Sequence, residues 1–248
     1  MVGKFGLITG AGSGVGRACA EALAQDGFTL ALTGRRSEPL EQTREALAGQ
    51  GHLVVPADIG KEEEVDRVFA QIEGTFGRLD LLFNNAGRNT PAVELDELPV
   101  DTWHEIMATN VTGAFLCARA AFGLMRRQSP RGGRIINNGS ISASVPRPLS
   151  LPYTASKHAI TGMTKSLALD GRKFDIACGQ IDIGNAASEM TERMAEGVLQ
   201  PDGSMQAEPR MDVRDVARTL SYMACLPAGS NALFVTVMAT KMPFVGRG

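Results

Sequence analysis

Apolar runs alternate with amphipathic stretches along the whole chain. The strand-like apolar runs cover residues 6–9, 29–33, 53–56, 79–84, 134–138, 175–181 and 233–238. The helix-like stretches between them cover residues 14–26, 38–49, 62–76, 100–127, 153–172 and 213–226. Because strands that alternate with helices form parallel sheets, the pattern predicts an α/β fold with a doubly wound parallel sheet and helices on both faces.

No internal repeat, low-complexity linker or charge block divides the chain, so the sequence predicts one domain over residues 1–248. The tract 183–209 is irregular, and a connection longer than ~12–15 residues tends to be functional. We interpret this tract as a substrate loop or lid, with a short amphipathic helix over residues 189–199. The apolar side chains expected to form the lid, with ordinary packing as the alternative, are Met190, Met194, Val198 and Leu199.

Composition excludes several classes of partner. Of the 248 residues, 44% are hydrophobic and 21% are charged, as in ordinary globular proteins. The formal net charge of −2 argues against a nucleic-acid surface or a basic membrane face. No apolar run approaches the ~18–20 residues that span a bilayer. Because the N-terminus passes directly into a strand-like run, we expect no signal peptide. We therefore expect a cytoplasmic protein that acts on a small molecule.

The cysteines and histidines carry no metal or redox motif. Cys19, Cys117, Cys178 and Cys225 are scattered, without a Cys-x-x-Cys pair, and the three histidines do not cluster. We interpret the cysteines as buried, reduced thiols, and we expect no metal site.

A glycine-rich turn follows the first strand and opens the first helix. It contains Gly10, Gly12, Ser13, Gly14, Val15 and Gly16. In this context backbone N–H groups and a helix N-terminus can bind a pyrophosphate. The spacing is G-x-x-x-G-x-G rather than the common G-x-G-x-x-G, and no Lys-Ser or Lys-Thr completes a P-loop. The turn therefore predicts dinucleotide binding, and a simple strand–helix turn is the alternative.

The end of the second strand indicates which dinucleotide binds. A dinucleotide fold usually holds an acid there for the ribose 2′-hydroxyl, but this chain has Arg35 and Arg36. A guanidinium suits a 2′-phosphate by charge and bidentate geometry. We therefore expect NADP(H) in preference to NAD(H), unless both arginines are only solvated charges.

Two further turns follow predicted strands. Asp58 and Ile59 come after the third strand, where the carboxylate could accept a hydrogen bond from an adenine amino group or cap the next helix. Asn84, Ala86 and Gly87 come after the fourth strand, where small residues suit a backbone that passes close to a ligand. A simple turn is the alternative there.

Asn110 and Ser140 are polar residues in unusual settings. Asn110 precedes Gly113 inside a predicted helix, although both residue types are unfavourable there. Such a conflict is typical of functional strain, with a packing kink as the alternative. Ser140 follows the fifth strand, and its hydroxyl could bind a substrate oxygen or simply be solvated.

Tyr153 and Lys157 lie four residues apart on a predicted helix, so their side chains are neighbours on one face. Tyrosine normally titrates near pH ~10, and a nearby cation favours the phenolate. A solvent-exposed contact supplies only about 0–1 kcal/mol, so the pair becomes useful only if it is shielded.

Taken in this order and spacing, these elements resemble the short-chain dehydrogenase/reductase family over residues 7–238. The resemblance implies a Rossmann-like domain with about seven parallel strands, a nicotinamide cofactor and often a homotetramer. It also implies that Tyr153 is the catalytic acid/base, that Lys157 favours its ionised form and holds the nicotinamide ribose, and that Ser140 orients the substrate. Asn110 would anchor a water that links Lys157 to bulk solvent.

One segment departs from the pattern of this family. After the sixth strand, members typically carry Pro-Gly and then a threonine near the nicotinamide carboxamide, whereas Asp182 and Ile183 stand here in place of Pro-Gly. Ser188 or Thr191 takes the threonine position. We expect Ile183 and Ser188 to contact the cofactor.

The residues together predict an NADP(H)-dependent oxidoreductase that interconverts a carbonyl and a secondary alcohol, working as a homotetramer or dimer. One alternative is a low-turnover NADP(H)-binding regulatory or scaffold protein, and another is a sugar-nucleotide epimerase or dehydratase. The tract 144–152 contains three prolines and is expected to wall the pocket. Arg147 within it would be either an exposed charge or a contact for an acidic substrate.

Overall fold

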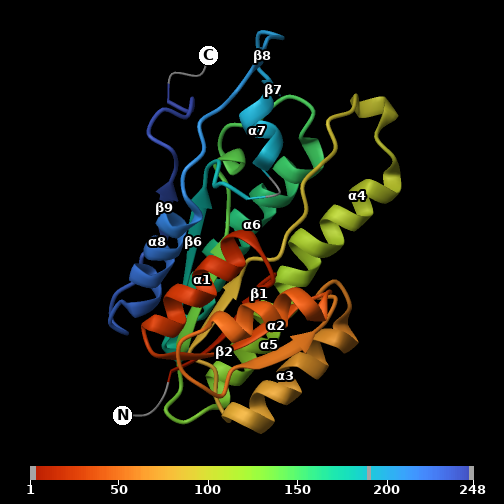
Figure 1. Ribbon diagram of the computed structural model, residues 1–248. Helices are drawn as coiled ribbons and strands as arrows, with labels where there is room; N and C mark the ends of the chain where they lie inside the picture. The colour runs from red at the N-terminus through yellow and green to blue at the C-terminus, as the bar shows by residue number, and fades with distance from the viewer. Residues whose placement is uncertain (1–3, 189–190, 246–248) are drawn as a thin grey trace.

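A computed structural model describes residues 4–188 and 191–245, and its centre is a sheet of seven parallel strands (Figure 1). The strands are β1 (Lys4–Thr9), β2 (Phe28–Gly34), β3 (Leu53–Pro56), β4 (Leu81–Asn84), β5 (Gly133–Asn138), β6 (Ile176–Ile183) and β9 (Phe234–Val237). Their order is β3-β2-β1-β4-β5-β6-β9. Successive strands are therefore added outward on one side from β1 to β3 and on the other side from β4 to β9, so the switch point lies between β1 and β4. Crevices at such a switch point bind ligands in open α/β sheets. The predicted Rossmann-like parallel sheet is confirmed.

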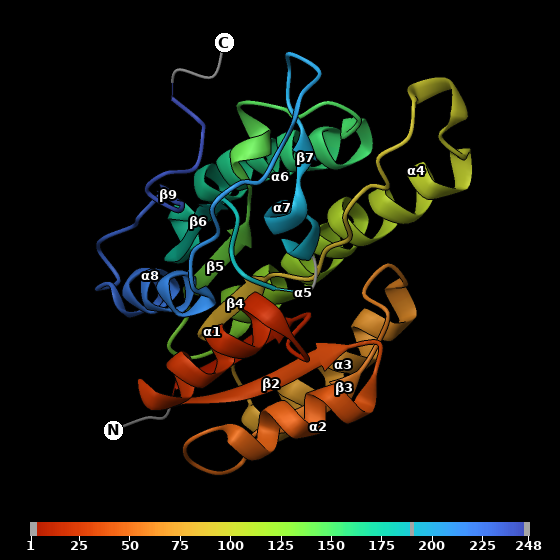
Figure 2. The same ribbon diagram turned by 45° about the horizontal axis from the view of Figure 1, so that its top comes forward.

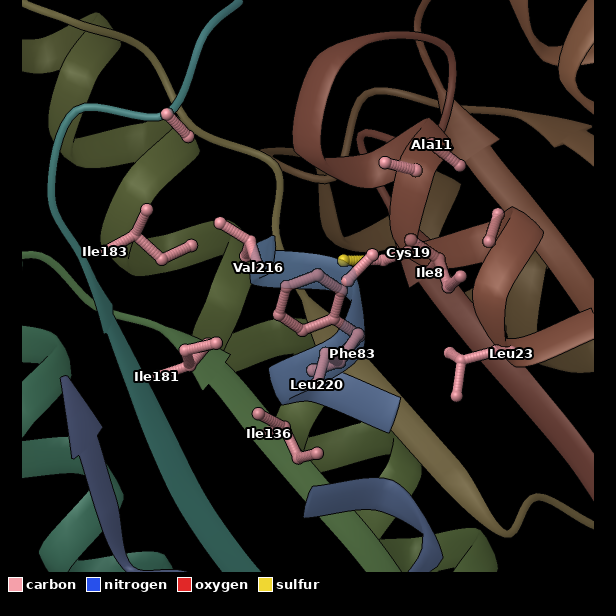
Figure 3. Packing of buried hydrophobic residues seen from close by; sticks show 14 of the residues in the cluster. Ile8, Ala11, Cys19, Leu23, Phe83, Ile136, Ile181, Ile183, Val216 and Leu220 are labelled. Atoms are coloured by element: carbon pink, nitrogen blue, oxygen red, sulfur yellow. The ribbon is translucent and has the colours of Figure 1, made fainter. Parts of the chain in front are cut away.

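Helices cover both faces of the sheet. They are α1 (Gly14–Gln25), α2 (Ser37–Ala46), α3 (Glu62–Phe76), α4 (Val100–Met107), α5 (Ala114–Arg127), α6 (Leu151–Asp170), α7 (Glu192–Glu196) and α8 (Val213–Cys225). Core residues of α1, α2 and α8 pack on one face, and those of α3, α5 and α6 pack on the other. Figure 3 shows Phe83 of β4 among side chains of α1 and α8.

Several predicted boundaries differ from the structure. The predicted helix 100–127 is interrupted by a π-helical turn, Ala108–Gly113. Helix α6 begins at Leu151, two residues before Tyr153, because Pro152 is favourable in a first turn. Strand β6 continues to Ile183, so Asp182 and Ile183 are strand residues rather than the start of a loop.

The predicted helix over residues 189–199 is shorter than expected. Helix α7 covers Glu192–Glu196, and the short strands β7 (Val198–Leu199) and β8 (Met205–Gln206) pair antiparallel after it. These elements lie together beyond the carboxyl end of β6 (Figure 2). The proposed lid residue Met190 lies outside the described residues. Among the helices that the structure describes, none is long and apolar enough to cross a membrane.

Candidate active site

The glycine turn forms the floor of a cleft at the carboxyl ends of β1 and β4. Gly10 and Gly14 have φ angles of 66° and 52°, which favour glycine. A methyl group on Gly16 would overlap the carbonyl oxygen of Gly10 and lie 2.7 Å from Nδ2 of Asn85. Glycine at position 16 therefore lets the start of α1 pack tightly against the turn, as in the strand–turn–helix units that bind the pyrophosphate of a dinucleotide.

The loop after β4 is bound to the glycine turn through Thr9. The hydroxyl of Thr9 accepts hydrogen bonds from the backbone N–H groups of Asn85 and Ala86, both at 2.9 Å. Nδ2 of Asn85 in turn donates to the carbonyl oxygens of Thr9 at 2.9 Å and Gly10 at 3.2 Å. These bonds join two loops that are far apart in the sequence, since Thr9 and Asn85 are separated by 76 positions.

Most residues predicted to bind a cofactor line this cleft, which has a volume of about 600 Å³. They are Gly10, Gly12, Ser13, Gly14, Val15, Gly16, Arg35, Arg36, Asp58, Ile59, Ala86, Gly87 and Ser188. Asn84 does not line it, because this buried side chain donates to the carbonyl oxygen of Ala114 and to Oδ1 of Asn137. Asn85, the next residue, takes the place at the cleft.

Arg35, Arg36 and Asp58 lie at the end of the cleft formed after β2 and β3. Both arginines are exposed, and α2 starts directly after them. Oδ1 of Asp58 accepts the N–H of Gly60 at 3.0 Å, whereas α3 begins later, after Lys61. The side chain of Asp58 therefore forms a local turn and does not cap α3. This favours a hydrogen bond with an adenine amino group over the role of a helix cap.

Lys157 is buried beside Tyr153 on α6. Its Nζ lies 5.5 Å from the centroid of the tyrosine ring, and only 6% of the residue is exposed. Nζ donates a hydrogen bond of 2.7 Å to the carbonyl oxygen of Asn138 at the end of β5. Burial supplies the shielding that the pair needs, because charge interactions are much stronger away from water.

Ser140 is held at the end of β5 by its neighbours. Its Oγ accepts the N–H of Ser142 at 3.1 Å, so the hydroxyl hydrogen is directed elsewhere. Its own N–H donates to Oδ1 of Asp182 at 3.0 Å, and Nε2 of Gln180 donates to the same oxygen at 2.7 Å. Burial raises the pKa of Asp182, while these two hydrogen bonds and the charge of Lys157 act against the rise.

The carboxylate of Asp182 thus holds the backbone of Ser140 in place. A methyl group on Gly139 would overlap Oδ1 of Asp182 and lie 2.6 Å from Nε2 of Gln180. A glycine at position 139 is therefore required by the carboxylate at position 182. The departure from Pro-Gly places an acid against the loop that carries Ser140. Ile183 and Gly184, which follow the acid, line a second cavity near Ser140 and not the cleft of the glycine turn.

Asn110 lies at the centre of the π-helical turn between α4 and α5. Its Oδ1 accepts the N–H of Arg88 at 2.7 Å. Its Nδ2 donates to the carbonyl oxygen of Arg88 at 3.0 Å and to Oγ of Ser156 at 3.1 Å. The predicted conflict at this position is a real break in the helix, and π turns occur frequently at functional sites.

A second cavity, of about 290 Å³, opens beside the first. We call it the substrate cavity, and its described lining residues include Asn89, Ser140, Tyr153, Ile183, Asn185, Thr191, Met194, Val198, Leu199 and Met205. Asn89 lines both cavities. Thr191 faces the substrate cavity, whereas Ser188 faces the cleft, where a methyl on Gly14 would lie 3.2 Å from Cβ of Ser188. Ser188 is therefore the better candidate for the threonine position of the family pattern.

Comparison with known proteins decides the family. The family model described as short chain dehydrogenase matches residues 4–198. The chain belongs to this family. Short-chain dehydrogenases are oxidoreductases that act on alcohol and carbonyl groups of small molecules, and their fold binds NAD(P)(H).

Individual short-chain dehydrogenases resemble the chain over most of its length. A 3beta-hydroxysteroid dehydrogenase of Mediterraneibacter gnavus is 33% identical over 198 residues, which cover 79% of this chain and 70% of the relative. A 3-ketoacyl-(acyl-carrier-protein) reductase from Brucella melitensis, solved with NADH, has a TM-score of 0.84 at 25% identity, with 96% and 98% of the two chains covered. A closed serine dehydrogenase with NADP+ has a TM-score of 0.86 at 24% identity, with 98% of each chain covered, and shares the fold.

Several residues that line the cleft of this short-chain dehydrogenase were not among the predicted cofactor-binding residues. These are Gly34, Pro39, Leu40, Ala57, Asn85, Arg88, Asn89, Thr109 and Asn138. Asn85 and Asn138 could have been found, because each stands at or directly after the end of a predicted strand, beside a residue that was singled out. Pro39 and Thr109 lie within helical segments and reach the cleft only through the packing of those segments.

Proposed function

We propose that the chain is an NADP(H)-dependent oxidoreductase that interconverts a ketone or aldehyde and its alcohol, with Tyr153, Ser140, Lys157 and Asn110 as its catalytic set. The observation that carries this proposal is the buried Lys157 beside Tyr153, with Ser140 and Tyr153 facing one cavity that adjoins the glycine cleft. An acid, an oxygen-binding hydroxyl and a shielded cation are the groups that carbonyl reduction requires.

In the direction of reduction, the substrate oxygen lies between Ser140 and Tyr153. Ser140 donates its hydroxyl hydrogen to that oxygen, since its Oγ already accepts the N–H of Ser142. Bound NADPH supplies the hydride that adds to the carbonyl carbon. Tyr153 gives its phenolic proton to the oxygen, and the ammonium of Lys157 stabilises the phenolate that results.

Asn110 contributes to the site by holding the backbone around it, and its side chain does not contact the substrate. Both polar atoms of that side chain are engaged with the main chain of Arg88 and with Ser156. The side chain of Asn110 is therefore a positioning group, and we infer that a relay water towards Lys157 binds a group other than this amide. The amide of Asn110 joins the π turn to the loop at Arg88 and to α6 at Ser156.

We propose that Ser140→Ala lowers kcat/KM for reduction by about 10²-fold, the usual cost of losing one donor to a developing oxyanion. Ser144→Ala is the matched control, because it makes the same change at an exposed position of the same loop. The assay is the absorbance of NADPH with a panel of ketones and aldehydes. Cofactor binding without turnover of any compound in the panel would favour the regulatory or scaffold alternative.

The preference for NADP(H) rests on Arg35 and Arg36 at the cleft, where an acid would be needed for NAD(H). Replacing both by alanine is expected to raise the KM for NADPH about 10–100-fold, because charge-assisted hydrogen bonds contribute about 1.5–3 kcal/mol. The KM for NADH should change little. Arg44→Ala serves as the control, since Arg44 lies on α2, the helix that follows the two arginines, and pairs with Glu41. Equal increases for NADPH and NADH would show that the arginines do not bind the 2′-phosphate.

We infer that residues 183–209 act as the lid of a single catalytic domain over residues 1–248. This is supported by Met194, Val198 and Leu199, which line the substrate cavity from this segment. A homotetramer or dimer is also proposed, because Phe115 on α5 and Leu169 on α6 are 50% and 61% exposed. Sedimentation velocity measures the assembly directly.

A further inference from the structure

A buried ion pair joins the two walls of the substrate cavity. Nη2 of Arg147, in the tract before α6, donates to Oε2 of Glu208, at the end of the lid segment. The side chain of Arg147 is 16% exposed and that of Glu208 is 1% exposed. The expectation that Arg147 is an exposed charge is therefore wrong, because the loop folds against residues 61 positions later in the chain.

Polar side chains surround the carboxylate of Glu208. Nδ2 of Asn185 donates to its Oε2 at 2.8 Å, and Nε2 of Gln200 donates to its Oε1 at 3.2 Å. Oδ1 of Asn185 also accepts from Nη2 of Arg147 at 3.0 Å, so Asn185 contacts both charges. The N–H of Glu208 donates to the carbonyl oxygen of Met194 at 2.7 Å, which fixes the acid to the lid.

The pair determines the charge of the substrate cavity. Among the described residues that line this cavity, Arg147 alone carries a full charge. The other described lining residues are polar but uncharged, or apolar, and the apolar ones include Ile141, Leu149, Ile183 and Met194. Because Glu208 neutralises Arg147 from behind the wall, a substrate carboxylate would have to displace a buried carboxylate that already has several donors.

We propose that Glu208 determines specificity by occupying Arg147, so that the substrate cavity accepts uncharged, largely apolar ketones and alcohols and rejects carboxylates. This inference rests on the proposed function, because it assigns a substrate class to the same site. Glu208 would thus act on specificity although it does not itself line the substrate cavity. Removing the charge of Glu208 takes away the carboxylate that Nη2 of Arg147 contacts, so that a carboxylate of the substrate can take its place beside the guanidinium.

The experiment compares two ketones that differ only in charge: a cyclohexanone that carries a methyl ester, and the same ketone with the free carboxylate. Wild-type protein with NADPH is expected to reduce the ester with the higher kcat/KM. Glu208→Gln keeps the shape of the side chain and should raise the acid-to-ester ratio of kcat/KM at least tenfold. Glu192→Gln, at an exposed position of α7, should leave the ratio unchanged.

The double variant Arg147→Met/Glu208→Gln shows whether the gain comes from Arg147. It should return the ratio to the wild-type value, since the guanidinium at position 147 is absent. An unchanged ratio in Glu208→Gln, or a gain that persists in the double variant, overturns the proposal. A wild-type preference for the acid also overturns it, and this outcome does not depend on the folding of any variant.

A binding measurement separates this inference from the proposed function. Cyclohexanecarboxylate should raise the melting temperature of Glu208→Gln with bound NADP+ but leave wild type and the double variant unchanged. If neither ketone is reduced, the proposed function fails while this thermal shift still tests the specificity role. If Glu208→Gln gains nothing from cyclohexanecarboxylate while hydride transfer works in wild type, only the specificity role fails.

Discussion

Tyr153→Phe is expected to lower kcat/KM for carbonyl reduction by about 10²–10⁴-fold, the usual contribution of a general acid or base. The substitution removes one hydroxyl group and leaves the ring that packs 5.5 Å from the ammonium of Lys157. Hydride addition would then create an alkoxide with no acid to protonate it. The measurement is the rate of NADPH oxidation with the best ketone of the panel, compared with wild type.

Two controls keep this result specific. Tyr222→Phe makes the same change at the other tyrosine, which is 62% exposed on α8, and should leave the rate unchanged. NADPH affinity and thermal stability should be the same in Tyr153→Phe and wild type, because the backbone N–H of Tyr153 still donates to Thr90. Near wild-type reduction by Tyr153→Phe would remove the residue from the mechanism.

The alternation of apolar and amphipathic stretches was sufficient to predict the sheet and the order of its helices. Every predicted strand overlaps one in the seven-stranded sheet, and helix α3 has the predicted bounds, Glu62–Phe76. The π-helical turn Ala108–Gly113 was visible in the sequence only as residues that are unfavourable in a helix. Helix propensity identifies such residues, but it does not say which hydrogen-bond pattern replaces the α-helix.

The candidate site shows the same division between local and distant contacts. Tyr153 and Lys157 are four residues apart on one helix, so their proximity follows from helix geometry. The choice between Asn84 and Asn85 was beyond the pattern, since neighbouring residues at the end of a strand point to opposite sides and only one faces the cleft. The Arg147–Glu208 contact joins two loops without regular spacing, so no periodicity in the sequence could predict it.

Gly16→Ala tests whether the glycine turn is shaped by close packing. Its added methyl would overlap the carbonyl oxygen of Gly10 and lie 2.9 Å from the carbonyl carbon. Backbone atoms cannot move aside as a flexible side chain can, so we expect a loss of about 3 kcal/mol in the free energy of unfolding, at the upper end of the usual cost of overpacking. Because Gly10 belongs to the proposed pyrophosphate cradle, NADPH binding should be lost as well.

Gly74→Ala is the matched control for this prediction. Gly74 lies in α3, and a methyl group there meets nothing within 4 Å. The same substitution should stabilise the protein by about 0.5–1 kcal/mol, because alanine is the better helix former. Urea unfolding of both variants, with NADPH titration followed by fluorescence, measures the two effects together. If Gly16→Ala unfolds at the same urea concentration as Gly74→Ala and still binds NADPH, the turn has room for a side chain and cannot form the tight cradle inferred here.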